Sequence, residues 1–187
     1  MSSGYTTALP TTMVPDVAVL KRDIASVSTV MGVTRGGVRF DPDVTWDNIP
    51  FDGKKDDIEG LDRTLGRRGR ISGTFIEIKD PLFNADILEP GVSLATAGTP
   101  TTITHTPVAA GTLLNTGDYI QNLLMVMARA DGKSVVVRMK RALCKKYSII
   151  GQDPQGNVVD CEFESRLAQS DAASSTDTAS YVVEIVG

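Results

Sequence analysis

Short runs of apolar residues that alternate with polar ones limit what this chain can fold into. In the segment Val158–Leu167, Val159, Cys161 and Phe163 fall at every second position, with charged residues between them. A period of two places successive side chains on opposite faces of a β-strand and does not fit one face of a helix. The chain is therefore predicted to be mainly β.

Similar β-rich runs recur along the chain, with turn-forming residues between them. Strands are expected at 25–33, 38–40, 44–46, 71–78, 101–107, 123–130, 134–140, 147–150, 158–167 and 181–186. Glycine and proline favour turns. Turns are accordingly predicted at Gly36-Gly37 and Asp131-Gly132, and a bend at Asp41-Pro42-Asp43.

One short helix is predicted between Asp80 and Gly91. Asp80 is a suitable N-cap, Pro81 fits the first helical position, and Pro90 with Gly91 favours an end. A helix of about two turns needs a sheet to pack on. The expected fold is a β-sandwich or partial barrel with one short flanking α-helix.

Composition divides the 187 residues into three kinds of segment. Residues 1–15 carry no charged side chain and are predicted to be an extended N-terminal arm. Residues 16–187 are predicted to be a single β-domain. Within that domain, 47–70 is expected to be a long charged loop, because six basic and four acidic residues lie between Lys54 and Arg70.

The overall composition argues against several classes of function. The 19 basic residues are outnumbered by 23 acidic ones, whereas a protein that grips nucleic acid normally has a basic excess. One histidine and two cysteines are too few for a Cys/His zinc site. Phosphate-loop, dinucleotide-binding and metalloprotease motifs are absent, as is any apolar run near the ~20 residues of a membrane helix. We therefore expect no cofactor, no metal and no membrane insertion.

Individual residues give no catalytic pattern. His105 is surrounded by threonines without a positioned serine or cysteine, so it is expected to be an ordinary strand or loop histidine. Asp41, Asp43 and Asp47 resemble part of a calcium loop but lack the bidentate glutamate at the required offset. The protein is therefore not expected to be an enzyme.

Cys144 and Cys161 fall on different expected strands. Buried free thiols are the simpler interpretation, and a disulfide between the two remains the alternative.

Charge is distributed unevenly in the last third of the chain. Residues 129–146 contain seven basic residues and one acidic residue, whereas 151–187 contain seven acidic and one basic. Opposite blocks of this kind suit self-association, although they are also compatible with an ordinary charged surface. Asp160, Glu162 and Glu164 stand on one face of a strand; they form either its solvated face or a pair of acid/base carboxylates.

The order of these features resembles that of the major tail tube protein of long, non-contractile-tailed (siphovirus-type) bacteriophages. The similar pieces are Trp46–Gly60, Arg70–Ile78, Leu82–Leu88, Ala130–Val137, Cys161–Ser165 and Tyr181–Ile185. The resemblance implies a structural subunit that forms hexameric rings, which stack into a hollow tube around a tape-measure protein and meet terminator and baseplate proteins. It also implies assembly in the host bacterial cytoplasm, location in the virion tail, and DNA that passes through unbound during genome ejection.

The resemblance implies two groups of functional residues. An acidic lumen would repel the DNA backbone, so Asp160, Glu162 and Glu164 are the expected lumen-facing residues. The charged loop is expected to order on stacking with the next ring, through Asp52, Lys54, Lys55, Asp56, Asp57, Glu59, Arg63, Arg67 and Arg68.

Two other functions remain open from the sequence. One is a monomeric β-barrel that binds a small ligand. The other is a different ring-forming component, such as a distal tail protein or a secretion-tube protein.

Overall fold

The computed structural model describes residues 18–24, 27–49, 56, 59–78, 93–97, 102–106, 109–151, 158–167 and 179–187. Most of this part is β-structure, which confirms the mainly β class. The strands are β1 (Ala18–Ile24), β2 (Val27–Val30), β3 (Gly32–Asn48), β4 (Asp62–Ile78), β5 (Ser93–Ala97), β6 (Thr102–Thr106), β7 (Ile120–Ala128), β8 (Ser134–Ile150), β9 (Val158–Arg166) and β10 (Tyr181–Val186). A single 3-10 turn, η2 (Thr116–Asp118), is the helical structure within these ranges. The arm at 1–15 and the helix expected between Asp80 and Gly91 lie outside the described residues.

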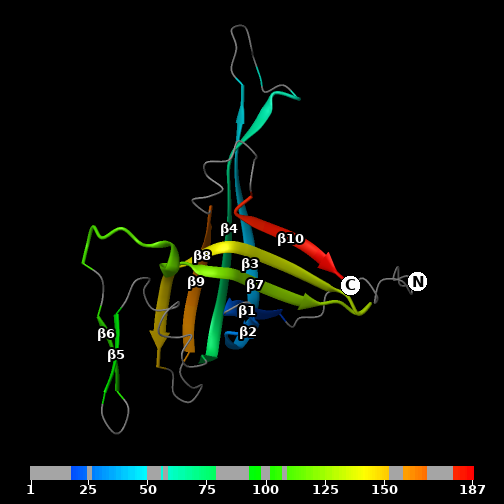
Figure 1. Ribbon diagram of the computed structural model, residues 1–187. Coiled ribbons are helices and arrows are strands. Elements are labelled where there is room, and N and C mark those ends of the chain that lie inside the picture. Colours follow the sequence, from blue (N-terminus) through cyan, green and yellow to red (C-terminus); the bar gives the residue numbers. More distant parts are fainter. Residues whose placement is uncertain are drawn as a thin grey trace.

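Eight strands form one open antiparallel sheet (Figure 1). Seven follow the order β2-β1-β7-β8-β9-β4-β3, and β10 pairs with β8 off this path; β5 and β6 form a separate pair. β2 and β3, at the two ends of that order, are joined in the chain through Met31. The sheet therefore curls to bring its ends together without closing, which is the partial-barrel form of the expected fold.

The 17-residue strand β8 organises this sheet. One of its edges pairs with β7 over residues 134–142. The other edge is shared end to end by β10, over residues 134–139, and by β9, over residues 141–150. A bulge between Cys144 and Lys146 interrupts the second ladder, and bulges let a long strand bend.

The concave face of the curled sheet holds the apolar core of the described residues. Its side chains come from every part of the sheet, and Leu20, Phe75, Phe163 and Met139 are among the most deeply buried. The whole cluster is Leu20, Met31, Ile71, Phe75, Ile120, Leu123, Met125, Val137, Met139, Ala142, Cys144, Cys161 and Phe163. On β9 these are the odd-numbered residues, as the period-two pattern predicted.

The turn predicted at Asp131-Gly132 is confirmed. Gly132 has a φ of +82°, and its N–H donates to the Arg129 carbonyl at 3.2 Å between β7 and β8.

The turn predicted at Gly36-Gly37 is wrong, because both residues lie inside β3. Their φ angles are +74° and +88°, and the pairing with β4 skips them, between Arg35 and Val38. Glycine's access to positive φ is used here for a bulge and not for a chain reversal.

The bend predicted at Asp41-Pro42-Asp43 is also wrong, because β3 runs straight through it. Pro42 pairs with Gly69, whose N–H donates to Ser165 Oγ at 2.7 Å on the β9 side and so points away from β3. Pro42 and Gly69 therefore form a non-hydrogen-bonded pair, and the proline nitrogen faces the outer rim of β3. A proline is tolerated there because no ladder needs its missing donor.

The charged loop predicted at 47–70 is strand at both of its ends. β3 continues to Asn48 and β4 begins at Asp62, so only 49–61 connects them. The two strands form a β3–β4 hairpin that extends well beyond the rest of the sheet, at the top of Figure 1. Arg63 Nη2 lies 2.8 Å from Asp47 Oδ2, and Asn48 Nδ2 donates to Asp62 Oδ1 at 2.8 Å. Charged side chains are compatible with a strand here because neighbours pair across the ladder and water solvates the rest.

Two buried serines join the base of this hairpin to the sheet. Ser165 Oγ accepts from the Gly69 N–H and lies 2.8 Å from Ser180 Oγ. Ser180 Oγ donates to the Arg67 carbonyl at 2.9 Å, so Ser165 must be the donor to Ser180. Hydroxyls thus tie β4, β9 and the start of β10 together.

Gly69 offers a sharp test of this packing. A Cβ there would lie 2.8 Å from Phe40 Cε2 and 3.0 Å from Tyr181 Cδ1, two rings that pack edge to face. Gly69→Ala should destabilise the fold by about 1–3 kcal/mol through overpacking. At Gly66, on the same strand, nothing lies within 4 Å of a new Cβ, so Gly66→Ala should stay within about 0.5 kcal/mol of wild type. Urea unfolding followed by circular dichroism measures both, and equal effects would contradict the packing.

Candidate functional site

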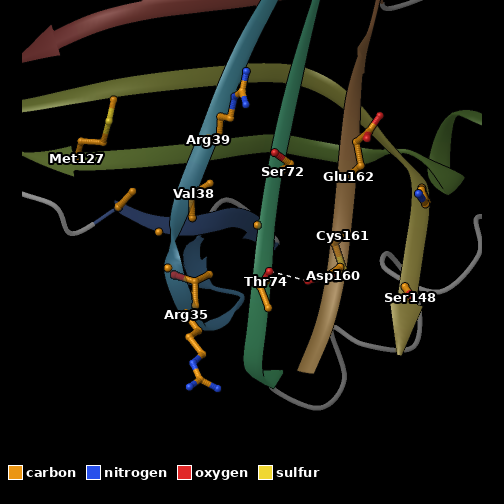
Figure 2. A pocket seen from close by; sticks show the side chains of 16 residues that line it. Arg35, Val38, Arg39, Ser72, Thr74, Met127, Ser148, Asp160, Cys161 and Glu162 are labelled. Atoms are coloured by element: carbon orange, nitrogen blue, oxygen red, sulfur yellow. Dashed lines mark hydrogen bonds between the residues drawn. The ribbon is translucent and has the colours of Figure 1, made fainter. Parts of the chain in front are cut away.

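The convex face of β3, β4, β9 and β8 carries aligned polar side chains (Figure 2). Strand register places them in two rows, one of Arg39, Ser72, Glu162 and Lys146, and one of Arg35, Thr74, Asp160 and Ser148. We call these eight residues the polar face. It contains two of the three carboxylates that the sequence singled out.

Those three carboxylates do not form a free acidic row. Thr74 Oγ1 donates to Asp160 Oδ1 at 2.5 Å, and Arg70 Nε lies 3.1 Å from Glu162 Oε1. Asp160 and Glu162 therefore each have a partner on β4.

Glu164 is the most enclosed charged group of this surface, with 3% of the residue exposed. Lys145 Nζ lies 2.6 Å from its Oε2, and Arg166 Nη1 lies 2.8 Å from its Oε1. Arg68 Nη1 approaches Oε1 at 3.6 Å. Burial acts to raise the pKa of the Glu164 carboxyl, but the hydrogen bonds from Lys145 and Arg166 outweigh it and hold that pKa at about 2.

Glu164 therefore does not belong to a solvated face of β9. The period-two pattern correctly placed it on the face of Asp160 and Glu162, but it could not reveal the cations from β4 and β8 that cover it. A carboxylate with a depressed pKa and three basic neighbours is a counter-ion and not a general acid.

The opposite charge blocks of the last third meet within one chain. The basic block lies on β8, which pairs with the acidic strands β9 and β10. Lys145 contacts Glu164 across the first ladder, and Arg138 Nη2 lies 3.7 Å from Glu184 Oε2 across the second. Among the described residues, part of each block is thus neutralised within the chain.

The residues predicted to act between rings fall into three groups. Asp52, Lys54, Lys55 and Asp57 lie outside the described residues. Asp56 and Glu59 are exposed in the connection between β3 and β4. Arg63, Arg67 and Arg68 are exposed on β4 itself and not on a loop.

The β3–β4 hairpin also exposes large apolar side chains, which the sequence analysis missed. Trp46 is 62% exposed and Leu65 is 60% exposed. Trp46 belongs to β3 and Leu65 to β4, the two strands of the hairpin that projects from the sheet (Figure 1). The available signal was that apolar residues, including Trp46 and Leu65, are scattered through this charged segment without the alternation of a strand that has one buried face.

A second exposed apolar surface lies on β10. Register aligns Ile185 with Val135 and Met127, and Val183 with the buried Val137. Ile185 and Val183 thus stand on the same face as the core, yet they are 62% and 53% exposed. We call the surface formed by Met127, Val135, Val137, Val183 and Ile185 the apolar wing.

The remaining candidates are His105 and the aspartates of β3. The backbone of His105 pairs with Leu94, and its side chain lies outside what the structure describes. Asp41 contacts Arg39 at 2.8 Å and Asp47 contacts Arg63, so neither faces a shared ion. Among the described residues, no group of three or more His, Cys, Asp or Glu side chains is placed to hold a metal.

An open groove of about 1220 Å³ runs over the bulge of β3 (Figure 2). Its lining combines the polar face with glycines of β3 and β4 and with a few apolar groups, including Ala18, Met127 and Cys161. Its charged groups have both signs and lie on separate strands, so the groove alone indicates no one class of ligand.

No protein-family model and no curated protein matches this chain. Within the residues that the structure covers, no helix has the length and apolar character needed to cross a bilayer.

Glu164 and its partners Lys145, Arg166 and Arg68, called the Glu164 cluster, predict how stability depends on pH. Because the folded-state pKa is about 2, below the ordinary value of 4.5, the ionised carboxylate stabilises the fold above pH 4.5. That contribution should disappear as the pH falls from 4.5 toward 2. Glu164→Gln should lower the free energy of unfolding at pH 7 by about 2 kcal/mol, the size of a lost charged hydrogen bond. It should also reduce the loss of stability between pH 4.5 and pH 2.

The control is Glu184→Gln, which removes a half-exposed ion pair and should cost less than about 1 kcal/mol. Urea unfolding at pH 3, 5 and 7 separates the two variants. If Glu164→Gln loses as much stability between pH 5 and pH 3 as the wild type does, the pKa assignment is contradicted.

Proposed function

We propose that this chain is a structural subunit that self-assembles into hexameric rings, which stack into the tail tube of a long-tailed bacteriophage. The hexameric ring and the stacked tube in this proposal come from the resemblance of the sequence to that family. The observation that carries self-assembly is the apolar wing, where an edge strand exposes apolar side chains next to a backbone rim without a ladder among the described residues.

A second copy is the occupant that fits the wing best. Unpaired strand edges invite pairing with another strand, and exposed apolar side chains beside such an edge add area that association buries. Among the described residues, β3 has a ladder only with β4 and β10 only with β8, so one chain presents two rims on different sides. Two different rims allow head-to-tail pairing, and such pairing generates rings when the rotation closes.

The β3–β4 hairpin is proposed to contact the next ring. It projects from the sheet and carries Trp46 and Leu65 with little apolar cover. Charges of both signs on the same hairpin, such as Asp47 and Arg63, suit a contact that is both apolar and polar.

The proposal assigns no reaction to the protein, and its partners are further copies, a tape-measure protein and the tube's terminator and baseplate proteins. Its site would be the virion tail, after synthesis and assembly in the host cytoplasm, and DNA would pass without specific contacts. Asp160 and Glu162 remain proposed lumen-facing residues, each with a partner that reduces its charge. Glu164 is not among them.

A small-ligand-binding protein is the second candidate, and the groove of about 1220 Å³ favours it. Ligand pockets are usually concave and mostly apolar, whereas this groove is open and is lined by polar and apolar groups in similar measure. A protein that stays monomeric at high concentration under the electron microscope would favour the ligand binder. Single rings that never stack would favour another ring-forming component, such as a distal tail protein.

The wing gives the most direct test of assembly. The double variant Val183→Lys, Ile185→Lys should fold with an unchanged melting temperature, because both side chains are more than half exposed. Charge on the wing should abolish rings and tubes in negative-stain images. The matched control is Ile149→Lys, 59% exposed on β8 away from the wing, which should still assemble. Normal assembly by the double variant would overturn the role of the wing.

The hairpin is tested by shortening it. Replacing residues 46–65 by Asn-Gly joins Thr45 to Gly66, which already face each other, with a favoured two-residue turn. The expected product is a folded protein that forms rings but no stacked tubes, as measured by sedimentation and imaging. The full-length control Asp47→Asn should still stack, and tubes from the shortened chain would contradict the inter-ring role.

A further inference from the structure

The Glu164 cluster holds more positive charge than its buried carboxylate can balance. Lys145, Arg166 and Arg68 come from three different strands, β8, β9 and β4. Each places a side-chain nitrogen near a Glu164 oxygen, at 2.6, 2.8 and 3.6 Å respectively. Three cations thus surround one anion, which leaves an excess of two positive charges at this point of the sheet.

The strand register adds a fourth cation beside the cluster. Arg141 on β8 pairs directly with Arg166 on β9. Directly opposed residues have Cβ atoms about 4.5–5.5 Å apart, and like charges in that position destabilise a sheet. Within the part of the chain that the structure describes, Arg141 makes no ion pair that would offset this repulsion. An anion held between the two guanidinium groups would remove it.

The cations of the cluster face solvent, whereas the carboxylate lies beneath them. The exposed fraction of the side chain is 69% for Arg68, 49% for Lys145 and 33% for Arg166, but only 4% for Glu164. A ligand that arrives from solvent therefore meets ammonium and guanidinium donors first. Glu164 is a positioning residue, because its two oxygens hold Lys145 and Arg166 in place before any ligand binds.

Acidic residues next to the cluster do not cancel its excess charge. Arg70 Nε lies 3.1 Å from Glu162 Oε1, so these two residues neutralise each other at the border of the cluster. Asp43 stands opposite Arg68 in the β3–β4 ladder. Even with Asp43 counted, four basic residues face two acidic ones, and two positive charges remain.

Charge and hydrogen-bonding geometry favour a phosphate group as the ligand. A guanidinium group can donate two parallel hydrogen bonds to the oxygens of a phosphate. A phosphate monoester carries about −1.5 to −2 charges at pH 7, which matches the excess of two, whereas a carboxylate carries one. A long polyanion such as DNA fits less well, because the whole chain has a net charge of −4 and would repel it.

We propose that Arg68, Arg141, Lys145 and Arg166 form a binding site for a small phosphate-bearing anion, above the positioning carboxylate of Glu164. The phosphate oxygens accept hydrogen bonds from the four cations, and no covalent bond forms or breaks. The ligand also separates the opposed charges of Arg141 and Arg166. This inference does not depend on the proposed assembly.

The test is a calorimetric titration of the full-length protein with inorganic phosphate and with tripolyphosphate, at low ionic strength where charges are least screened. One tripolyphosphate should bind per chain, and its affinity should fall as salt is added. Arg68→Gln and Arg141→Gln, on different strands, should each weaken binding about 10-fold, the effect of losing one charge-assisted hydrogen bond. Circular dichroism checks that both variants remain folded.

The matched control is Arg63→Gln. Arg63 is 57% exposed on the same strand as Arg68 but pairs with Asp47 outside the cluster, so its loss should leave the affinity unchanged. Acetate should not compete at concentrations where phosphate binds. The proposal is overturned by a wild type that binds neither phosphate compound, or by Arg68→Gln and Arg141→Gln variants that bind as tightly as the wild type. Equal binding of acetate, or binding of a single-stranded oligonucleotide in preference to tripolyphosphate, would also overturn it.

Discussion

The fold depends on a single strand, β8, because three other strands hydrogen-bond to it. β7 occupies one of its edges, while β9 and β10 divide the other. This arrangement forces β8 to serve two parts of the sheet that face different directions, and the bulge after Cys144 accommodates the change. The core, the Glu164 cluster and the apolar wing all follow from which part of β8 each neighbour pairs with.

Much of the fold could be read from periodicity. The alternation around Phe163 correctly separated core residues from polar ones on β9, and Asp131-Gly132 gave a correct hairpin. The turn predicted at Gly36-Gly37 and the bend predicted at Pro42 were wrong, because glycine also occurs in β-bulges and proline also occurs on edge strands. The charged stretch before Arg70 misled for a related reason: a projecting hairpin needs no buried face, so its strands lack the apolar alternation that identifies strands elsewhere.

The candidate site was only partly accessible from the sequence. Asp160 and Glu162 could be placed on one face, but their partners Thr74 and Arg70 come from a strand about 90 residues away. Ion pairs formed across a ladder depend on register, which a single sequence does not specify. The wing was missed because apolar residues on a strand, such as Val183 and Ile185, do not show in the sequence whether another element covers them. Only their high exposure on the core-facing side makes them unusual.

The position of Pro42 limits what the outer rim of β3 can do. The rim belongs to a 17-residue strand, long enough to template open-ended fibre growth, yet it lacks an amide donor near its middle. An incoming strand meets this gap and must settle on one side of it. Pro42 thus divides the unpaired edge of β3 into two shorter stretches of backbone donors and acceptors. This favours strand pairing in a fixed register over indefinite aggregation.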